Sequence, residues 1–199
     1  MARAAASSAT TLLIRSNCLA FEGRGIAFAP MASGDDLLAY VEIPKGSRNK
    51  YEYDERLGEL TLDRFLSSST VYPTDYGYLI DHRGRDGDPL DAMVCVSEPT
   101  FPGCVISVKP IALFKMRDEK GEDDKIVCVP LRDPGWNHAE TLDDIPKPMQ
   151  REITHFFSIY KELEGKEVDV DGWRSREEAL EVIEEAKRLE AEHRARQAG

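Results

Sequence analysis

The stretch Arg85-Asp86-Gly87-Asp88-Pro89-Leu90-Asp91 is followed directly by the apolar run Ala92-Met93-Val94-Cys95-Val96. The glycine and the proline favour a turn, because proline fixes φ at about −65° and stops any helix. Leu90 is apolar and can anchor this turn from below. The five apolar residues that follow have the length of a buried strand. The stretch therefore predicts an acidic turn that leads into a strand of a β-rich fold.

Asp86, Asp88 and Asp91 place three carboxylates within six residues. In an extended chain Asp86 and Asp88 would lie on the same side. Carboxylates brought this close repel by roughly 4 kcal/mol per pair, at a separation of about 4 Å and an effective dielectric constant of about 20. Either some of them are protonated or a divalent cation lies among them. Hard oxygen ligands at this density suit Mg²⁺, Mn²⁺ or Ca²⁺.

The acidic stretch also has two simpler interpretations. A solvated acidic turn needs no ligand. A calcium loop of the EF-hand type fails on its own pattern: with Asp86 as position 1, Asp91 stands at position 6, where glycine is needed, and Ser97 at position 12, where glutamate is needed. The rest of the chain has to decide between a metal site and a solvated turn.

The composition is that of a globular chain of one domain: 199 residues, 41% hydrophobic and 32% charged. The formal net charge is −11 at pH 7. A protein this acidic is a poor partner for nucleic acid or for an anionic membrane, and it is well suited to divalent cations. No apolar run approaches the roughly 20 residues of a membrane span. We therefore expect neither nucleic acid nor a membrane as a partner.

Residues 1–33 differ from the rest, because they are rich in Ala, Ser and Thr and carry three arginines against a single acid. This composition is compatible with an organelle transit peptide. The alternatives are a disordered extension or a translation start at Met31. We expect residues 1–35 to be an extension without fixed structure and residues 36–199 to form a single domain. The expected location is the cytoplasm, or an organelle if residues 1–30 are a transit peptide.

The four cysteines show no CxxC spacing, and three of them lie in apolar, strand-like runs. Buried free thiols are therefore expected rather than disulfides or a zinc site, which points to a reducing compartment. The four are Cys18, Cys95, Cys104 and Cys128.

Short runs with a β pattern, separated by turn signals, extend from residue 38 to residue 130. Tyr51 and Tyr53 face Leu60 and Leu62 across a turn, in the alternating pattern of a hairpin. Many short strands with close turns indicate a closed or half-closed barrel rather than alternating strands and helices. The other expected strands are 38–43, 78–80, 92–96, 105–116 (interrupted by Pro110) and 125–130.

The last 55 residues change to a helical period. The first predicted helix carries Ile153, Phe156, Phe157, Tyr160 and Leu163 on one face, and Gly165 and the segment 168–173 end it. Ser175 and Glu178 form a capping box before a second amphipathic helix with Ala179, Val182, Ile183, Ala186 and Leu189. The apolar faces of these helices leave room for contacts between subunits.

Further groups of chemical interest surround the acidic turn. Segment 118–125 joins two apolar strands and has five acids in seven positions, although an acidic hairpin tip is often only solvated surface. Tyr72-Pro-Thr-Asp-Tyr76-Gly-Tyr78 precedes the turn. Its aromatic residues can belong to the core, or a tyrosine beside carboxylates can donate its hydroxyl to a phosphate oxygen.

Taken singly, Lys50, Arg64 and the pair Tyr160-Lys161 are typical surface residues. Glu42 and Glu52 alternate with apolar neighbours and can face a cavity.

Taken together and in order, these motifs resemble the soluble family I inorganic pyrophosphatases in their short prokaryotic form, over about residues 39–174. That form normally starts close to its first strand, so the N-terminal residues are a departure. The motifs are Glu42-Ile-Pro, Lys50-Tyr-Glu52, Asp63-Arg64-Phe, Tyr72-Pro-x-x-Tyr76-Gly-Tyr, Asp86-Gly-Asp88-Pro-Leu-Asp91, Asp118-Glu119-x-Gly-x-Asp123-x-Lys125 and His155-Phe-Phe-x-x-Tyr160-Lys161.

The resemblance implies an α+β, mostly β fold: an OB-like five-stranded barrel with flanking C-terminal helices. It also implies a homohexamer that hydrolyses diphosphate to two phosphates with several Mg²⁺ ions, for which Mn²⁺ can substitute. Two other functions are weighed against it. A nucleic-acid-binding OB module would need a basic, aromatic-studded groove, which a net charge of −11 argues against. A relative that only buffers metal would lack some motif position, and none is missing.

The resemblance also assigns roles to single residues. Asp88 is the expected general base, with Asp123 as the competing candidate. Tyr72 completes the pocket. The expected metal site is Glu42, Asp86, Asp91, Asp118 and Asp123, and the expected substrate-binding residues are Lys50, Arg64, Tyr76, Lys125, Tyr160 and Lys161.

Overall fold

The computed structural model describes residues 37–119 and 121–197. The expected extension of residues 1–35 and Cys18 lie outside the described residues, so the domain boundary and the compartment stay predictions. No described helix is both long and apolar enough to cross a membrane.

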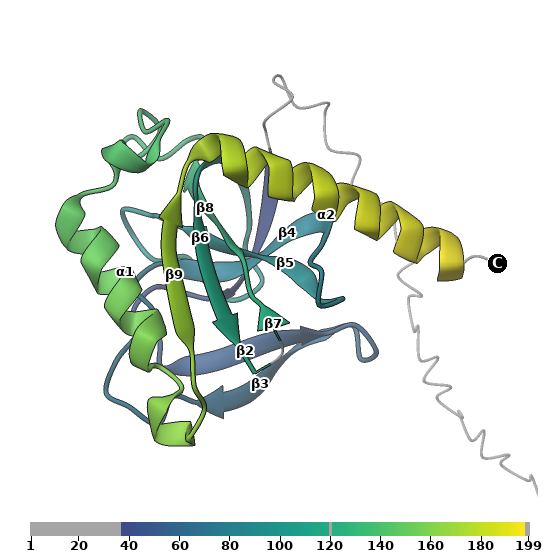
Figure 1. The fold of residues 1–199 in the computed structure, drawn as a ribbon, viewed down its shortest axis with the longest axis horizontal. Coiled ribbons are helices and arrows are strands. Elements are labelled where there is room, and N and C mark those ends of the chain that lie inside the picture. The colour runs from purple at the N-terminus through teal and green to yellow at the C-terminus, as the bar shows by residue number, and fades with distance from the viewer. Residues whose placement is uncertain (1–36, 120, 198–199) are drawn as a thin grey trace, which may run out of the picture. The chain divides into compact units, whose positions relative to one another are not determined.

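The centre of the fold is a closed ring of five strands (Figure 1). The last strand of the ring pairs back with the first, from Leu37 opposite Val108 to Tyr40 opposite Val105. All neighbours in the ring are antiparallel except β5 and β8, which are parallel. This confirms the predicted barrel. In ring order the strands are β1 (Leu37–Ile43), β4 (Asp75–Arg83), β5 (Pro89–Val94), β8 (Lys125–Pro130) and β6 (Val105–Asp118).

Two further strands extend β6 beyond the ring, and a separate hairpin lies beside it. β7 (Gly121–Glu122) and β9 (Asp169–Arg174) both pair antiparallel with β6. β2 (Asn49–Asp54) and β3 (Glu59–Phe65) form the predicted hairpin. The sequence predicted 168–173 only as the end of a helix. The segment is a strand because it completes hydrogen bonds along β6, and Trp173 packs edge-on against Phe114 with ring centroids 5.2 Å apart.

β6 runs through Pro110 without a break. Its register with β8 shifts between Pro110 and Ala112, which is how a strand accommodates a proline that cannot donate a hydrogen bond. The carbonyl of Pro110 accepts a hydrogen bond of 3.0 Å from Arg176 Nε at the start of α2 (Arg176–Gln197). The predicted interruption is therefore a local irregularity inside one long strand.

Both predicted helices are present, although the first ends earlier than expected. α1 (Lys147–Ile159) is preceded by the short 3-10 helix η1 (Leu142–Asp144) and followed by η2 (Glu162–Glu164). Ile153, Phe156 and Phe157 are buried as predicted. Leu163 was expected on the same apolar face; it lies in η2 instead and is 67% exposed, because the α-helical period has already ended.

α2 begins as the capping signal predicted. The Glu178 amide donates to Ser175 Oγ at 3.4 Å, which satisfies one of the free N–H groups at the helix start. Ala179, Ile183 and Ala186 then pack on the barrel.

The barrel strands are covered on both faces, as β8 shows most clearly. All six residues of β8 are buried. Val127 and Val129 belong to the core cluster that includes α1, and Ile126 and Cys128 to the one that includes α2. The apolar faces of both helices are therefore used inside the subunit. Their buried residues are not available for subunit contacts, whereas the expectation that the helices leave room for such contacts stays a prediction.

The cysteines of the described residues are free, as predicted. Cys95 and Cys128 are fully buried, whereas Cys104 is partly exposed. Burial raises the pKa of Cys95 to about 12 and raises that of Cys128 as well. Both thiols therefore stay protonated and pack as small apolar groups.

Gly77 permits the close crossing of β1 and β4. A Cβ atom at this position would lie 1.9 Å from the carbonyl oxygen of Tyr40 and 2.9 Å from the amide nitrogen of Glu42. Both are backbone atoms of β1, so no side-chain rotation can make room. Gly77 lies between Tyr76 and Tyr78, and all three residues pair with β1.

We expect Gly77→Ala to lower the free energy of unfolding by about 3 kcal/mol or more, because overpacking here must push two strands apart. Urea unfolding of the purified protein measures it. Gly58→Ala is the matched control: that residue has φ +67° but open space around it, so the cost should be only about 1 kcal/mol. Equal losses in the two variants would contradict the clash.

Candidate active site

One cavity of about 550 Å³ gathers almost all of the predicted site residues. Lys125 lies just behind its wall, with 1% of its side chain exposed. Tyr72 was also expected to complete the pocket, but it is fully buried and packs against Tyr76 instead. The predicted residues that line the cavity are Glu42, Lys50, Arg64, Tyr76, Asp86, Asp88, Asp91, Asp118, Asp123, Tyr160 and Lys161.

The acidic turn of residues 84–88 forms the tip of the β4–β5 hairpin. The Gly84 amide donates to the Asp88 carbonyl at 2.7 Å, and the Asp88 amide donates to Asp86 Oδ1 at 3.1 Å. Gly87 has φ +92°, which only glycine adopts without strain. Asp86 and Asp88 therefore lie on a tight turn, as the glycine and the proline predicted.

Lys125 stands at the centre of the acidic cluster. Its Nζ lies 2.6 Å from Asp91 Oδ2 and 2.7 Å from Asp123 Oδ1, and it donates to the Tyr76 hydroxyl at 3.0 Å. Burial lowers the pKa of Lys125, but the charges of Asp91 and Asp123 outweigh burial and raise it, so the ammonium stays charged. The Tyr76 hydroxyl in turn donates to Asp91. One buried cation thus holds two carboxylates from different segments.

A second ion-pair group lies at the end of β6. Lys161 Nζ is 2.7 Å from Asp118 Oδ2 and 3.6 Å from Glu119 Oε2. Lys166 also pairs with Glu119, at 2.7 Å. Lys161 directly follows Tyr160, which the last turn of α1 turns toward the same cavity.

The β2–β3 hairpin brings the third group. Lys50 pairs with Glu52 and lies 3.4 Å from Asp63. Arg64 pairs with Asp63, and its Nε donates to Glu164 Oε1 at 2.9 Å. In this structure every predicted phosphate-binding cation therefore holds a carboxylate of its own protein. Cations are interspersed among a larger number of carboxylates around the cavity.

Two carboxylates of the cavity are poorly solvated. Burial, and next the nearby charge of Asp91, raise the pKa of Glu42 to about 7, although its hydrogen bond from the Tyr53 amide opposes the shift. Burial also raises the pKa of Asp123, against the lowering effect of Lys125. A further positive charge nearby would stabilise the ionised form of both carboxyl groups, and this favours binding of a cation.

The donor set fits a hard divalent cation. Carboxylates line the cavity from β1, the 84–88 turn, β5 and the segment around β7, and oxygen ligands of this kind are what Mg²⁺ prefers. Asp124 Oδ1 is buried without a hydrogen-bond partner in the described structure, so the site has acceptor capacity to spare. Within residues 37–119 and 121–197, no three acidic, histidine or cysteine side chains converge closely enough to hold an ion as they stand. Lysine side chains separate the carboxylates.

Several cavity residues were not predicted. Arg83 and Arg85 flank Gly84 at the base of the acidic turn, and Glu185 reaches the cavity from α2. Arg83 pairs with Glu190, also on α2. The sequence offers no signal for these pairs, because their members lie about a hundred positions apart and depend on where the last helix packs.

The raised pKa of Glu42 makes the metal-free protein sensitive to pH. A carboxyl that ionises near pH 4.5 when unfolded and near 7 when folded destabilises the fold increasingly between these values, and fully above 7. We expect Glu42→Gln to remove this penalty, which amounts to roughly 3 kcal/mol at pH 8. Denaturant unfolding at about pH 5 and about pH 8 in excess EDTA measures it. Glu181→Gln, on the exposed face of α2, is the control and should leave the pH dependence unchanged.

Comparison with known proteins identifies the family. A sequence model of the inorganic pyrophosphatase family matches residues 39–190. The inorganic pyrophosphatase of Methanosarcina mazei is 58% identical over 147 residues, covering 74% of this chain and 87% of the relative. That of Streptomyces coelicolor is 52% identical over 145 residues, covering 72% and 89%.

Solved structures agree with the sequence comparison. The crystal structure of the inorganic pyrophosphatase from Thermus thermophilus superposes with a TM-score of 0.78 at 40% identity, over 81% of this chain and 94% of that one. The inorganic pyrophosphatase from Helicobacter pylori gives a TM-score of 0.78 at 34% identity, over 83% and 99%. The chain therefore belongs to the inorganic pyrophosphatase family and is a hydrolase of inorganic diphosphate.

Proposed function

We propose that this enzyme hydrolyses diphosphate with Mg²⁺, by attack of water on one phosphorus in line with the departing phosphate. The observation that carries the proposal is that carboxylates and cations line one cavity together. A purely acidic pocket would repel the substrate, and a purely basic one would not hold metal ions. Both kinds of side chain are needed for a reaction between a polyanion and water.

The carboxylates of the cavity are the proposed metal ligands. Asp86, Asp91, Asp118 and Asp123 would hold Mg²⁺, with Glu42 supporting the site; Mn²⁺ has similar preferences and would substitute. When bound, such ions lower the pKa of water and offset charge on the phosphate oxygens. Their positive charge would also offset the cost of burying the ionised carboxylates of Glu42 and Asp123, which raises the pKa values of both groups.

Asp88 is the proposed general base for the attacking water. It lies on the acidic turn and lines the cavity, where it can accept a proton as the oxygen approaches phosphorus. Asp123 is the competing candidate, because burial raises its pKa toward the range of an effective base. Lys125 already binds the Asp123 carboxylate at 2.7 Å, and this contact opposes proton uptake there.

The cations and hydroxyls would bind the phosphate groups. Lys50, Arg64 and Lys161 would exchange their present carboxylate partners for phosphate oxygens and so stabilise charge on the leaving group. Tyr160 would donate its hydroxyl: burial, followed by the charges of nearby carboxylates, raises its pKa and keeps it protonated. Tyr76 and Lys125 also belong to the proposed substrate-binding residues, and both donate hydrogen bonds to Asp91.

Phosphate release from diphosphate tests the proposal directly. We expect release with Mg²⁺ and none in excess EDTA, and a loss of roughly 10²–10⁴-fold in kcat for Asp88→Asn if it is the base. Asp123→Asn should lose activity as well and raise the Mg²⁺ requirement. Asp143→Asn makes the same chemical change at a side chain that is 92% exposed, so its rate should match the wild type. Full activity in excess EDTA would contradict the metal-dependent mechanism.

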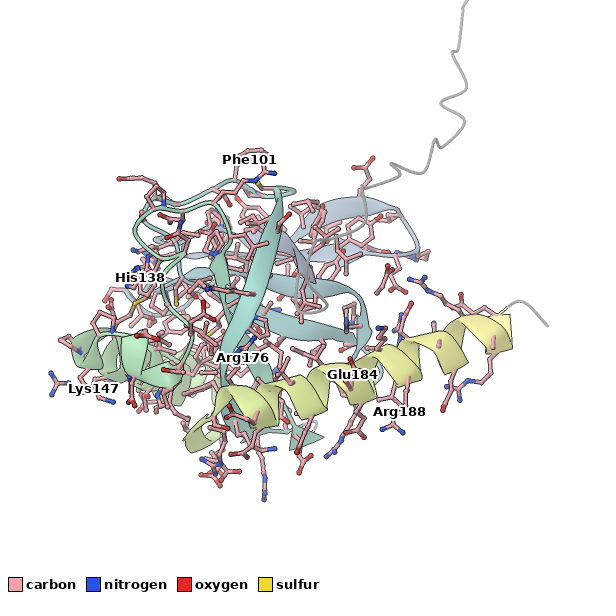
Figure 2. The ribbon with its side chains drawn as sticks, turned by 90° about the horizontal axis from the view of Figure 1, so that it is seen from above. Phe101, His138, Lys147, Arg176, Glu184 and Arg188 are labelled. Atoms are coloured by element: carbon pink, nitrogen blue, oxygen red, sulfur yellow. The ribbon has the colours of Figure 1, made fainter. Side chains whose placement is uncertain are left out.

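We also propose that the enzyme is a homohexamer, on the strength of the family resemblance. Contacts between subunits would have to use surface other than the apolar faces of α1 and α2. Large apolar side chains are available for them: Phe65, Phe101 and Leu163 are 62%, 64% and 67% exposed. Phe101 and the start of α1 at Lys147 lie at the periphery in Figure 2. Light scattering should give six times the chain mass, and a stable monomer would contradict this.

A further inference from the structure

We infer that Arg83 and Glu190 form a brace through which the C-terminal helix positions the acidic turn of residues 84–88. The inference rests on the proposed function, because its consequence for turnover depends on the roles given to Asp86 and Asp88. Both members of the brace are positioning residues. Neither is placed among the groups that bind metal or substrate.

Arg83 connects three separate parts of the fold through its three guanidinium nitrogens. Nε donates to Glu190 Oε2 on α2 at 2.7 Å. Nη1 donates to the carbonyl of Gly87 within the acidic turn. Nη2 lies 3.3 Å from Glu55 Oε1, in the connection between β2 and β3. The planar fork of an arginine fixes all three directions at once, which a lysine could not do.

The central pair is shielded from water. The side chains of Arg83 and Glu190 are each 12% exposed, so their charge-assisted hydrogen bond is stronger and less screened by salt than a surface pair. The other oxygen of Glu190, Oε1, accepts a hydrogen bond of 2.7 Å from Arg194 Nε. Arg194 also pairs with Asp81 on β4. Glu190 therefore cannot rotate away without losing both arginines.

The hydrogen bond from Arg83 to the Gly87 carbonyl connects the brace to the acidic turn. Gly87 lies between Asp86 and Asp88 and has φ +92°. The carbonyl direction of this residue sets the peptide plane that leads into Asp88. Backbone hydrogen bonds from Gly84 to Asp88 and from Gly87 to Gly84 close the turn from inside, whereas Arg83 anchors it from outside.

Arg85 adds a weaker tie of the same kind. Its Nε and Nη2 donate to Glu185 Oε1 and Oε2 on α2, at 3.2 and 2.7 Å. Its Nη1 donates to Glu122 Oε2 on β7 at 2.7 Å. The Arg85 side chain is 58% exposed, so solvent screening reduces its contribution. Figure 2 shows α2 continuing from Arg176 past Glu184 and Arg188 toward its end, the part of the helix that carries these contacts. The brace proper is therefore the buried pair.

Loss of the brace should loosen the turn and make cation binding there costlier, because the turn must then be ordered on binding. Outer contacts that orient ligand groups are typically worth 10–100-fold in metal affinity or activity. We expect Glu190→Gln and Arg83→Met each to raise the Mg²⁺ concentration for half-maximal phosphate release by about tenfold. The double variant should be no worse than Arg83→Met alone, because Glu190 acts through Arg83.

A second readout needs neither metal nor turnover. In the metal-free protein, backbone amides of residues 84–88 should exchange with deuterium faster in both variants, whereas those of β8 keep their protection. Glu181→Gln makes the same substitution on the exposed face of α2, and both readouts should match the wild type.

The brace is overturned if neither variant changes the Mg²⁺ concentration for half-maximal phosphate release, or if the effects of the two substitutions on it add in the double variant. It is also overturned if amide exchange in residues 84–88 is unchanged, or if exchange in β8 accelerates equally. The proposed function fails separately, if Asp86→Asn and Asp88→Asn keep wild-type turnover. The exchange comparison still tests the brace in that case, because it reads the turn itself.

Discussion

The site is organised around one buried ammonium group, Lys125 Nζ, held between the carboxylates of Asp91 and Asp123. Parallel pairing of β5 and β8 places Ala92 opposite Ile126, so the residues just before them, Asp91 and Lys125, come together at one end of the barrel. Breaking a buried pair of this kind leaves an uncompensated charge and is far more costly than breaking one at the surface. The strands and the chemistry of the cavity are therefore fixed by the same contact.

Closure of the barrel explains why distant segments supply one cavity. The β4–β5 turn and the connection from β6 to β8 lie at the same end of the ring, and the β2–β3 hairpin adds Lys50 and Arg64 from the side (Figure 1). Lys125 pairs with Asp123 and Lys161 with Asp118, which offsets part of the negative charge of the cavity. In the proposed mechanism, a diphosphate with its metal ions would bring both charges with it and so replace these internal pairs.

Local signals in the sequence were sufficient for most of the fold. Alternating strands, the hairpin at residues 51–62 and the two amphipathic helices were predicted because burial and turn residues are encoded within a few positions. β9 was missed because its pairing with β6 is a tertiary choice. The motifs predicted which residues share the cavity. They did not predict the Arg83–Glu190 pair, whose members are 107 positions apart and meet only through helix packing.

The pairing of β1 with both β4 and β6 has a consequence for how the chain folds. One edge of β1 pairs with β4, about forty positions later in the chain. The other edge pairs with β6, in which Val108 lies opposite Leu37. Such long-range pairing must offset a large loop-closure entropy, so folding is expected to be slow for the size of the chain. During synthesis on the ribosome, β1 emerges early with one edge unpaired. Nascent chains stalled before residue 105 should therefore be the species most prone to aggregate or to need a chaperone.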